Sequence, residues 1–330
     1  MAADSKTAVL GAVIGNSILT VLKFGAFLLS GSGAMLSEAI HTAADAANQA
    51  LLYVGLKRSL RPEDRRHNYG YGGERFLFAL LSAVGIFVFG CGVTVYHGIH
   101  TWFHPPELKL SWHVFAVLGL GLLLDGVVLM LAVKAVWRQK GEEGLFSYLR
   151  TATDPSAIAV LLEDAVACLG VLVAFVCIGL AHATGDTRWD AVGSILIGAM
   201  MGGIAIWLGV KNRTLLLGRA ASPELVADAV DFLRAQPSVL KVSRVRSRVV
   251  SADHVKLQVD IDFNGAWFGR ELDGWVRSRL PERDDRPAAE RFAEDFGRVM
   301  LDRVGEEVDR IEREMLARFP RLRFIELEAD

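Results

Sequence analysis

The sequence predicts an α-helical membrane protein with six transmembrane helices and a C-terminal cytoplasmic α+β domain of ferredoxin-like, αββαβ order. The chain has 330 residues, 52% of them hydrophobic, and the hydrophobic residues gather in the first two thirds. The last third is dense in Arg, Glu and Asp, so we expect two domains, residues 1–219 and 220–330. Six apolar stretches in the first domain are each long enough to cross a bilayer, which takes about 20 helical residues.

The apolar stretches are continuous rather than alternating, so they predict helices and not barrel strands. Basic residues gather in every second connection between them, which predicts that both termini are cytoplasmic. The start of the chain has neither the basic region of a signal peptide nor a transit peptide. We therefore expect the first stretch to be retained and the membrane to be a bacterial inner membrane. The stretches lie near Val9–Leu29, Ala34–Leu56, Phe76–Trp102, Trp112–Val136, Ser156–Ala181 and Ala191–Val210.

The C-terminal third alternates helical and strand patterns. Ser222 is a good N-cap with Pro223 after it, which predicts a helix to about Ala235. Further along, Val255 to Phe263 alternate on one face as in a half-buried strand. Residues 265–286 are charged with interspersed aromatic residues and predict no definite element. The expected elements after the first helix are strands Lys241–Val250 and His254–Phe263, a helix Ala288–Arg318 and a strand Leu322–Leu327.

Composition and motifs exclude several classes of protein. The formal net charge is −2, which gives no case for a nucleic-acid partner. Cys91, Cys168 and Cys177 lie inside apolar runs without CxxC spacing, so we expect small buried side chains rather than disulfides or a thiolate zinc site. The sequence contains no GxxxxGK[ST] motif for ATP and no HExxH motif for a zinc protease.

The second apolar stretch has a polar face. Its polar residues recur at helical spacing and so lie along one side. Each ionisable residue at mid-membrane costs at least about 2.5–3.5 kcal/mol, so such residues need a partner and usually have a function. The polar residues of this face are Glu38, His41, Asp45, Asn48 and Gln49.

His41 and Asp45 are four residues apart and therefore close enough to grip one ion. Imidazole nitrogen with carboxylate oxygen suits zinc, and also manganese, iron or cobalt. The fifth stretch offers Glu163 and Asp164 as further ligands. The alternative is a buried His–Asp pair that merely ties two helices together.

Asp125, in the middle of the fourth stretch, has two interpretations. It could be a proton relay or a partner of His41, with Glu38 and Asn48 also in proton coupling or in support of the ligands. It could instead accept hydrogen bonds from Asn16 or Asn48 as a structural group. We favour the functional interpretation.

Four weaker signals lie elsewhere. Asp64 and His67 form a candidate loop metal site, although a solvated loop is the stronger interpretation. Gly198 and Gly202 form a small-xxx-small pair that permits close helix packing. The C-terminal third has His254 as its one histidine and no cysteine, so we expect mainly a dimerisation unit. His97, His100 and His104 suggest an interfacial cluster more than a metal site.

Two motifs resemble those of the cation diffusion facilitator family. The run SGSGAMLSEAIHTAADAANQ, residues 30–49, resembles the junction of that family's first and second spans, and HNYGYGGERF, residues 67–76, resembles the entry to its third span. The similarity covers essentially the whole chain. His41 ahead of Asp45, together with an LLED run, is closest to a mitochondrial zinc-transporter subgroup.

The resemblance implies a homodimer that exchanges divalent metal for protons, with His41 and Asp45 as ligands. The family usually has His or Asp four residues before Asp164, but this chain has Val160. Glu163 lies about 100° around the helix from Asp164. Either the helix is locally distorted, or the ion is held by three protein ligands and water.

The expected function is therefore a secondary transporter that moves zinc, or manganese, iron or cobalt, against protons by alternating access, with no prosthetic group and no enzymatic activity. Metal binds best when the imidazole is neutral and the carboxylates are ionised, so protons compete for the same groups. Two alternatives remain open. One is an intramembrane metal-dependent enzyme, and the other is a membrane scaffold with a site that does not transport.

Overall fold

The structure is a computed structural model that describes residues 2–105, 112–139, 144, 155–251, 253–282 and 285–329. Contacts divide the chain into two compact units, Met1–Leu217 and Gly218–Asp330, two residues from the expected boundary. Lys109, Lys140 and Arg150, which belong to connections between the predicted membrane helices, lie outside the described residues.

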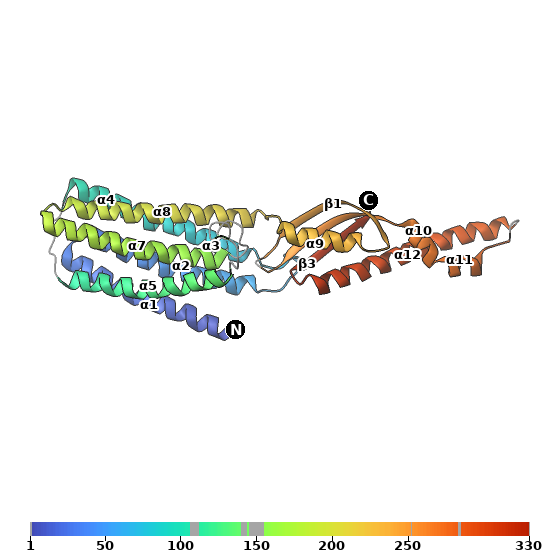
Figure 1. Cartoon of the computed structure of the whole chain (residues 1–330), viewed down its shortest axis with the longest axis horizontal. Helices are drawn as coiled ribbons and strands as arrows, with labels where there is room; N and C mark the ends of the chain where they lie inside the picture. The colour runs from blue at the N-terminus through green and yellow to red at the C-terminus, as the bar shows by residue number, and fades with distance from the viewer. Residues whose placement is uncertain are drawn as a thin grey trace. The chain divides into compact units, whose positions relative to one another are not determined.

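The first unit is a bundle of long helices (Figure 1). Every expected membrane helix overlaps a helix of the structure. Large apolar side chains point outward all around it; Val21, Phe89 and Met130, for example, are 69–72% exposed, as expected for lipid-facing positions. The helices are α1 Ala2–Ser30, α2 Gly33–Ser59, α3 Glu74–Gly85, η1 Ile86–Val93, α4 Thr94–Phe103, α5 Trp112–Gln139, α7 Pro155–Thr184 and α8 Arg188–Leu216.

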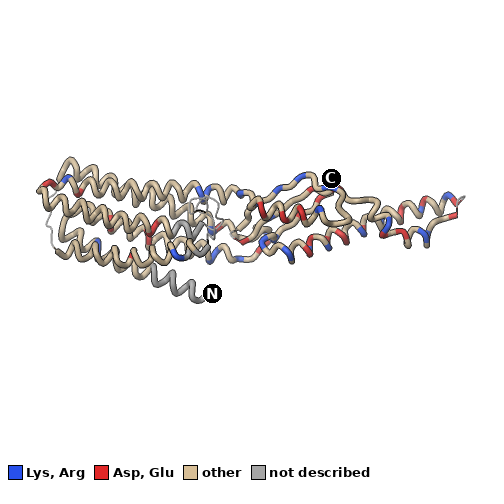
Figure 2. Tube along the Cα trace, in the orientation of Figure 1, with Lys and Arg blue, Asp and Glu red and all other residues tan. Residues whose placement is uncertain are grey.

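Five of these helical segments are long and apolar enough to cross a membrane by length and composition. Helix α2 is not among them, although it has 27 residues. Its polar face, which includes Glu38, His41 and Asp45, lowers its hydropathy. Figure 2 shows that charged residues are sparse along the helices of the first unit and frequent, with both signs, along the second.

The third apolar stretch is continuous but not uniform. It forms α3, a π-helix from Ile86 to Val93, and then α4, whereas the sequence predicted one regular helix. Helix α8 packs closely along it. A Cβ added at Gly202 would lie 2.7 Å from Cys91 Sγ, and one at Gly198 would lie 2.7 Å from Val95 Cγ2. The predicted close packing at this glycine pair is confirmed.

Helix α2 is the central helix of the first unit. It packs against α1, α3, α7 and α8, and residues from Gly33 to Asn48 are largely buried. Apolar side chains of α1, α2, α5, α7 and α8 form a continuous core. The polar face of α2 is therefore enclosed by neighbouring helices.

The second unit has three strands and four helices within the described residues, in the expected αββαβ order apart from two short helices. Ser222 Oγ accepts a hydrogen bond from Leu225 N and caps α9 as predicted. The sheet order is β1-β2-β3, with β1 antiparallel and β3 parallel to β2. The elements are α9 Pro223–Arg234, β1 Val239–Val249, β2 Val255–Phe263, α10 Gly265–Glu271, α11 Asp273–Arg279, α12 Arg286–Arg318 and β3 Leu322–Ala329.

One face of the sheet forms the core of this unit. Val255, Leu257, Val259 and Ile261 of β2 are at most 1% exposed, which confirms the predicted alternation. They pack with buried residues of α9 and α12, so both helices cover this face. The segment left unassigned from sequence forms α10 and α11, and Trp275 of α11 packs against two phenylalanines of α12 at ring distances of 5.5 and 6.2 Å.

Candidate metal site

The first two candidate ligands lie one turn apart on α2. His41 Nε2 is 3.3 Å from Asp45 Oδ2, and the side chains are 6% and 19% exposed. Within the described part of the chain, neither ring nitrogen of His41 has a hydrogen-bond partner, because the contact to Asp45 is close but not aligned as a hydrogen bond. Buried polar atoms normally have partners. An open imidazole beside a carboxylate therefore suits a cation.

Helix α7 brings the other two candidate ligands to α2. Asp164 Oδ2 is buried and has no hydrogen-bond partner among the described residues. Glu163 differs, because its Oε2 accepts a hydrogen bond of 2.6 Å from Asn48 Nδ2. Asn48 Oδ1 in turn accepts one of 2.5 Å from Ser82 Oγ. This chain of hydrogen bonds links α3, α2 and α7.

Helix α7 is regular from Pro155 to Thr184. The local distortion that would turn Glu163 and Asp164 to the same side is not found. In a regular helix neighbouring residues point about 100° apart. Asn48 donates a hydrogen bond to the Glu163 carboxylate, while Oδ2 of Asp164 has no hydrogen-bond partner among the described residues.

A second polar group lies beside the first and contains a residue that sequence analysis missed. Lys23 of α1 is 0% exposed, and its Nζ donates to Glu38 Oε2 at 3.0 Å and to Thr42 Oγ1 at 2.8 Å. Asp125 Oδ2 of α5 is 3.9 Å from the same nitrogen. Asp125 thus faces Lys23, while Asn48, one of its two expected donors, bonds Glu163. A single lysine inside the apolar run of α1 was the available signal.

The two groups form one electrostatic cluster. The carboxyl groups of Asp45, Asp125 and Asp164 are close enough to interact with one another, and Lys23 acts on both His41 and Asp45. No three His, Cys, Asp or Glu side chains of the described residues are close enough together to hold a metal ion as they stand. The structure brings His41 and Asp45 together and leaves Asp164 as a near neighbour.

The candidate loop site is a hydrogen-bonded turn. Asp64 accepts hydrogen bonds from Tyr71 Oη at 2.7 Å and from the backbone N–H groups of Arg66 and His67 at 2.8 Å each. These bonds, first the one from Tyr71, hold the pKa of Asp64 below its usual range. The His67 ring lies on that of Tyr71 at 4.2 Å. Both Asp64 oxygens are used within the loop, which favours a structural role.

His97 and His100 of α4 and His104, which follows that helix, do not converge on one point. His100 and His104 stack at 4.8 Å. His97 lies apart from this pair against α2, where a Cβ added at Gly33 would lie 3.0 Å from its ring. The arrangement favours an interfacial cluster.

Asp190 is a buried carboxylate that sequence analysis also missed. It is 0% exposed and accepts hydrogen bonds from Ser32 Oγ at 2.5 Å, Gly33 N at 2.5 Å and Ala34 N at 3.2 Å. These groups form the N-terminus of α2, which attracts negative charge. Asp190 thus fixes the start of the helix that carries His41 to the start of α8.

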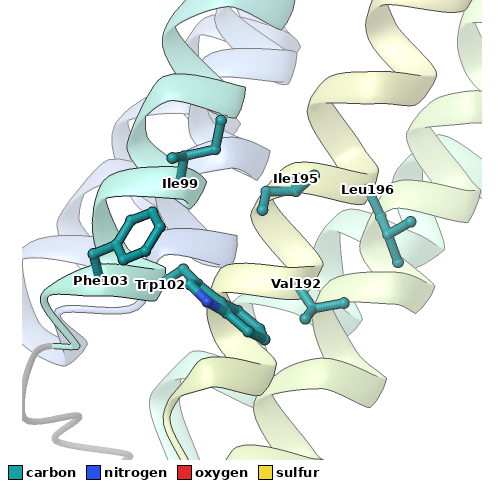
Figure 3. A pocket seen from close by; sticks show the side chains of 6 residues that line it. All are labelled: Ile99, Trp102, Phe103, Val192, Ile195 and Leu196. Carbon is teal, nitrogen blue, oxygen red and sulfur yellow. The ribbon is translucent and has the colours of Figure 1, made fainter.

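An apolar pocket of about 370 Å³ opens between α4 and α8 (Figure 3). Its lining residues all have apolar bodies, and none belongs to the polar cluster. It therefore offers no metal ligand. The lining is Ile99, Trp102, Phe103, Val192, Ile195 and Leu196.

Three relatives resemble most of this chain. It is 32% identical over 327 residues to the proton-coupled zinc antiporter SLC30A9, mitochondrial, of Homo sapiens, covering 97% of this chain and 58% of the relative. It is 33% identical over 338 residues to metal tolerance protein C4 of Arabidopsis thaliana, covering 98% and 73%. It is 23% identical over 254 residues to magnetosome protein MamB of Magnetospira sp. (strain QH-2), covering 74% and 79%.

The chain spans a little under three fifths of the length of the antiporter relatives that it matches. A family model described as the cation efflux transmembrane domain matches residues 9–217. That match runs from within α1 to the end of α8 and includes the polar cluster. The resemblance seen in the two sequence motifs is therefore confirmed, and the chain belongs to the cation efflux family.

Proposed function

We propose that this protein is a secondary transporter that moves divalent metal, with zinc as its substrate, across a membrane in exchange for protons. The observation that carries the proposal is the buried His41–Asp45 pair on the central helix, whose imidazole nitrogens have no other partner in the described structure. Membership of the cation efflux family and the similarity to a proton-coupled zinc antiporter support it.

The proposed ligands are His41, Asp45 and Asp164, with water completing a four-coordinate ion. One imidazole and two carboxylates suit zinc, and also manganese, iron or cobalt. Glu163 was a candidate for the fourth ligand. Its hydrogen bond from Asn48 supports instead a role in holding α7 against α2.

Binding requires a movement, since the described side chains do not yet surround an ion. We propose that Asp164 approaches the His41–Asp45 pair through a shift of α7 relative to α2. Such a shift is the kind of rearrangement that alternating access requires. Protons compete with metal for the imidazole and both carboxylates, so loading on one side and protonation on the other gives exchange.

We propose that α2 also crosses the membrane, which brings the number of spans to six. Glu38, His41 and Asp45 are then shielded from lipid by the helices packed around α2. The basic residues of alternate connections support cytoplasmic termini. Localisation of the protein to a bacterial inner membrane stays a prediction.

The second unit is proposed as a ferredoxin-like dimerisation domain of a homodimer. Its αββαβ order and its sheet with helices on one face support that fold. The loop site at Asp64 and His67 is not part of the proposal, because its groups bond one another.

Neither rival function has comparable support. An intramembrane metalloenzyme needs a metal with an open position and a general base, and a scaffold needs no ion at all. Family membership and the named activity of the antiporter relatives favour transport over both.

The test is zinc flux into proteoliposomes under an imposed pH gradient. We expect gradient-dependent flux in the native protein and its loss in both Asp45→Ala and Asp164→Ala. Asp64→Asn is the matched control, since that carboxylate lies in the exposed loop, and it should keep the native rate. Absence of flux of zinc, manganese, iron and cobalt alike in the native protein would overturn the proposal.

A further inference from the structure

Lys23 is the most deeply buried cation in the described part of the chain. It lies within the candidate membrane span of α1, and its side chain is 0% exposed. The chain of methylene groups passes Gly121 of α5, where an added Cβ would lie 3.1 Å from Lys23 Cε. A lysine at this depth is costly and by default functional.

Burial of this ion pair is not explained by stability. Removing two charges from water costs several kcal/mol per ion, and apolar residues of similar volume often serve as well or better. The ion pair is also incompletely hydrogen-bonded. The second carboxylate oxygen of Glu38, Oε1, is buried and makes no hydrogen bond within the described residues. The pair therefore calls for a role beyond holding α1 against α2.

The contacts of Lys23 connect it to the proposed metal site. Its ammonium bonds Glu38, one turn before His41, and Thr42, the residue next to His41. Its charge acts on His41 and on Asp45. It does not contact either ligand directly, so its influence on a bound ion is electrostatic.

The cluster around Lys23 contains more acidic than basic side chains. Five acidic side chains gather around α2 and α7, and Lys23 is the one basic lysine or arginine among them in the described structure. A divalent cation in so acidic a setting would be held tightly and released slowly. A carrier must release its ion to turn over. The acidic residues are Glu38, Asp45, Asp125, Glu163 and Asp164.

We propose that Lys23 is a resident internal cation, a positioning residue whose fixed charge offsets Glu38 and Asp125 and so limits the affinity of the neighbouring site for zinc. This inference rests on the proposed function. It assigns Lys23 and Glu38 to the tuning of affinity, with neither of them a ligand. It predicts that the net charge of the Lys23–Glu38 pair, more than its shape, sets zinc binding.

The test compares three variants by the KM of zinc transport in proteoliposomes and by zinc affinity of the purified protein in detergent. Glu38→Gln removes the carboxylate and leaves Asp125 as the acidic neighbour of Lys23, so the pair changes from zero to one net positive charge while Lys23 keeps its proton. We expect KM and the dissociation constant to rise by at least about tenfold. Glu38→Asp keeps the charge and serves as the matched control, with both values within about threefold of native.

The double variant Glu38→Gln/Lys23→Met decides between charge and structure. It restores the native net charge with a neutral pair, so both constants should return to within about threefold of native. Equal constants in Glu38→Gln and the native protein, or a double variant as weak as Glu38→Gln, would overturn the role of Lys23. Because the native protein is measured alongside, its failure to move any metal would instead refute the proposed function.

Discussion

At the residue scale, the polar side chains of the first unit divide by whether they already have partners. Glu163, Asn48 and Ser82 satisfy one another across three helices. His41 and Asp164 keep buried atoms without partners in the described structure. Because an unmade buried hydrogen bond costs about 1–3 kcal/mol, His41 and Asp164 are the open groups expected to bind an ion. Glu38 Oε1 is open as well, but that carboxylate is held by Lys23 through Oε2.

His41→Ala should weaken zinc binding more than it weakens the fold. The change removes the one nitrogen ligand that we propose and leaves two carboxylates, so zinc affinity should fall at least about tenfold, the scale seen when even supporting groups of a metal site are lost. Equilibrium dialysis of the purified protein measures this. His100→Ala is the matched control, since that ring stacks on His104 outside the cluster, and it should bind zinc as the native protein does.

Asp190→Asn tests the fixing of α2. The carboxylate accepts three hydrogen bonds from the start of α2, and a neutral amide can accept fewer of them. We expect a loss of about 1–3 kcal/mol, read as a lower Tm in detergent. Asp228→Asn at an exposed position of α9 should leave Tm unchanged, and an equal loss in both would contradict the assignment.

At the element scale, the apolar runs predicted the helices well because a bilayer allows little else. The polar face of α2 and its enclosure by other helices followed from the cost of charge in lipid. The π-helix from Ile86 to Val93 was missed, because the run IFVFGCGV has no polar position and so shows no period that could separate an α turn from a π turn. The short helices α10 and α11 were missed because their mixed charged and aromatic residues show no clear face.

The roles of two residues could not be predicted because their partners are distant in sequence. Asp190 lies one residue before the predicted stretch Ala191–Val210, and its partner Ser32 is 158 positions away. Lys23 pairs with Glu38 across the α1–α2 turn and with Asp125 on α5. The apolar pattern of the sequence locates a charged residue within or beside a helix, but it does not identify the distant residues that the charge contacts.

Gly170→Ala tests the close approach of α7 to α2. An added Cβ would lie 2.6 Å from Glu38 Oε1, so Glu38 or the helix must shift. We expect a stability loss of about 1–3 kcal/mol, as for other overpacked interiors, together with a changed zinc KM. A Cβ added at Gly179 on the same helix meets no atom within 4 Å, so the Tm of Gly179→Ala should stay level or rise. A larger loss of Tm in Gly179→Ala than in Gly170→Ala would contradict the packing.

The second unit contains a pH-sensitive contact between α12 and Ser238, the residue before β1. Glu307 accepts hydrogen bonds from Arg310 and from Ser238 Oγ, and these, with Arg310 first, lower its pKa. A depressed pKa means that the contact is at full strength above about pH 4.3, the unfolded value, and is lost as pH falls through the folded pKa.

Glu307→Gln should therefore remove part of the acid sensitivity of this unit. The protection of the Asn264 backbone N–H, which bonds the Ser238 carbonyl, is measured as its exchange rate relative to an unstructured peptide at the same pH. This protection should fall as the pH drops below about 4.3 in the native chain and change less with pH in the variant. Glu294→Gln, at an exposed position of the same helix, is the matched control and should respond to pH as the native chain does. An identical pH response in the native chain and Glu307→Gln would refute the role of Glu307.

At the scale of the whole molecule, the family match covers the helical unit, and similarity to the antiporter relatives extends through both units. The candidate site is contained in the first unit, on the central helix and its neighbour α7. The sequence motifs were enough to identify the family, since they combine a tight turn with a polar face at helical spacing. The affinity-setting charge of Lys23 lies outside those motifs and needed the packed structure.

The most direct test is to measure proton movement driven by zinc, with no pH gradient imposed. Proteoliposomes containing the native protein and an internal pH dye receive external zinc. If zinc and protons compete for His41, Asp45 and Asp164, zinc entry should make the interior more alkaline as protons leave, and Asp164→Asn should abolish both changes. Zinc entry with no change in internal pH would contradict proton exchange at this site.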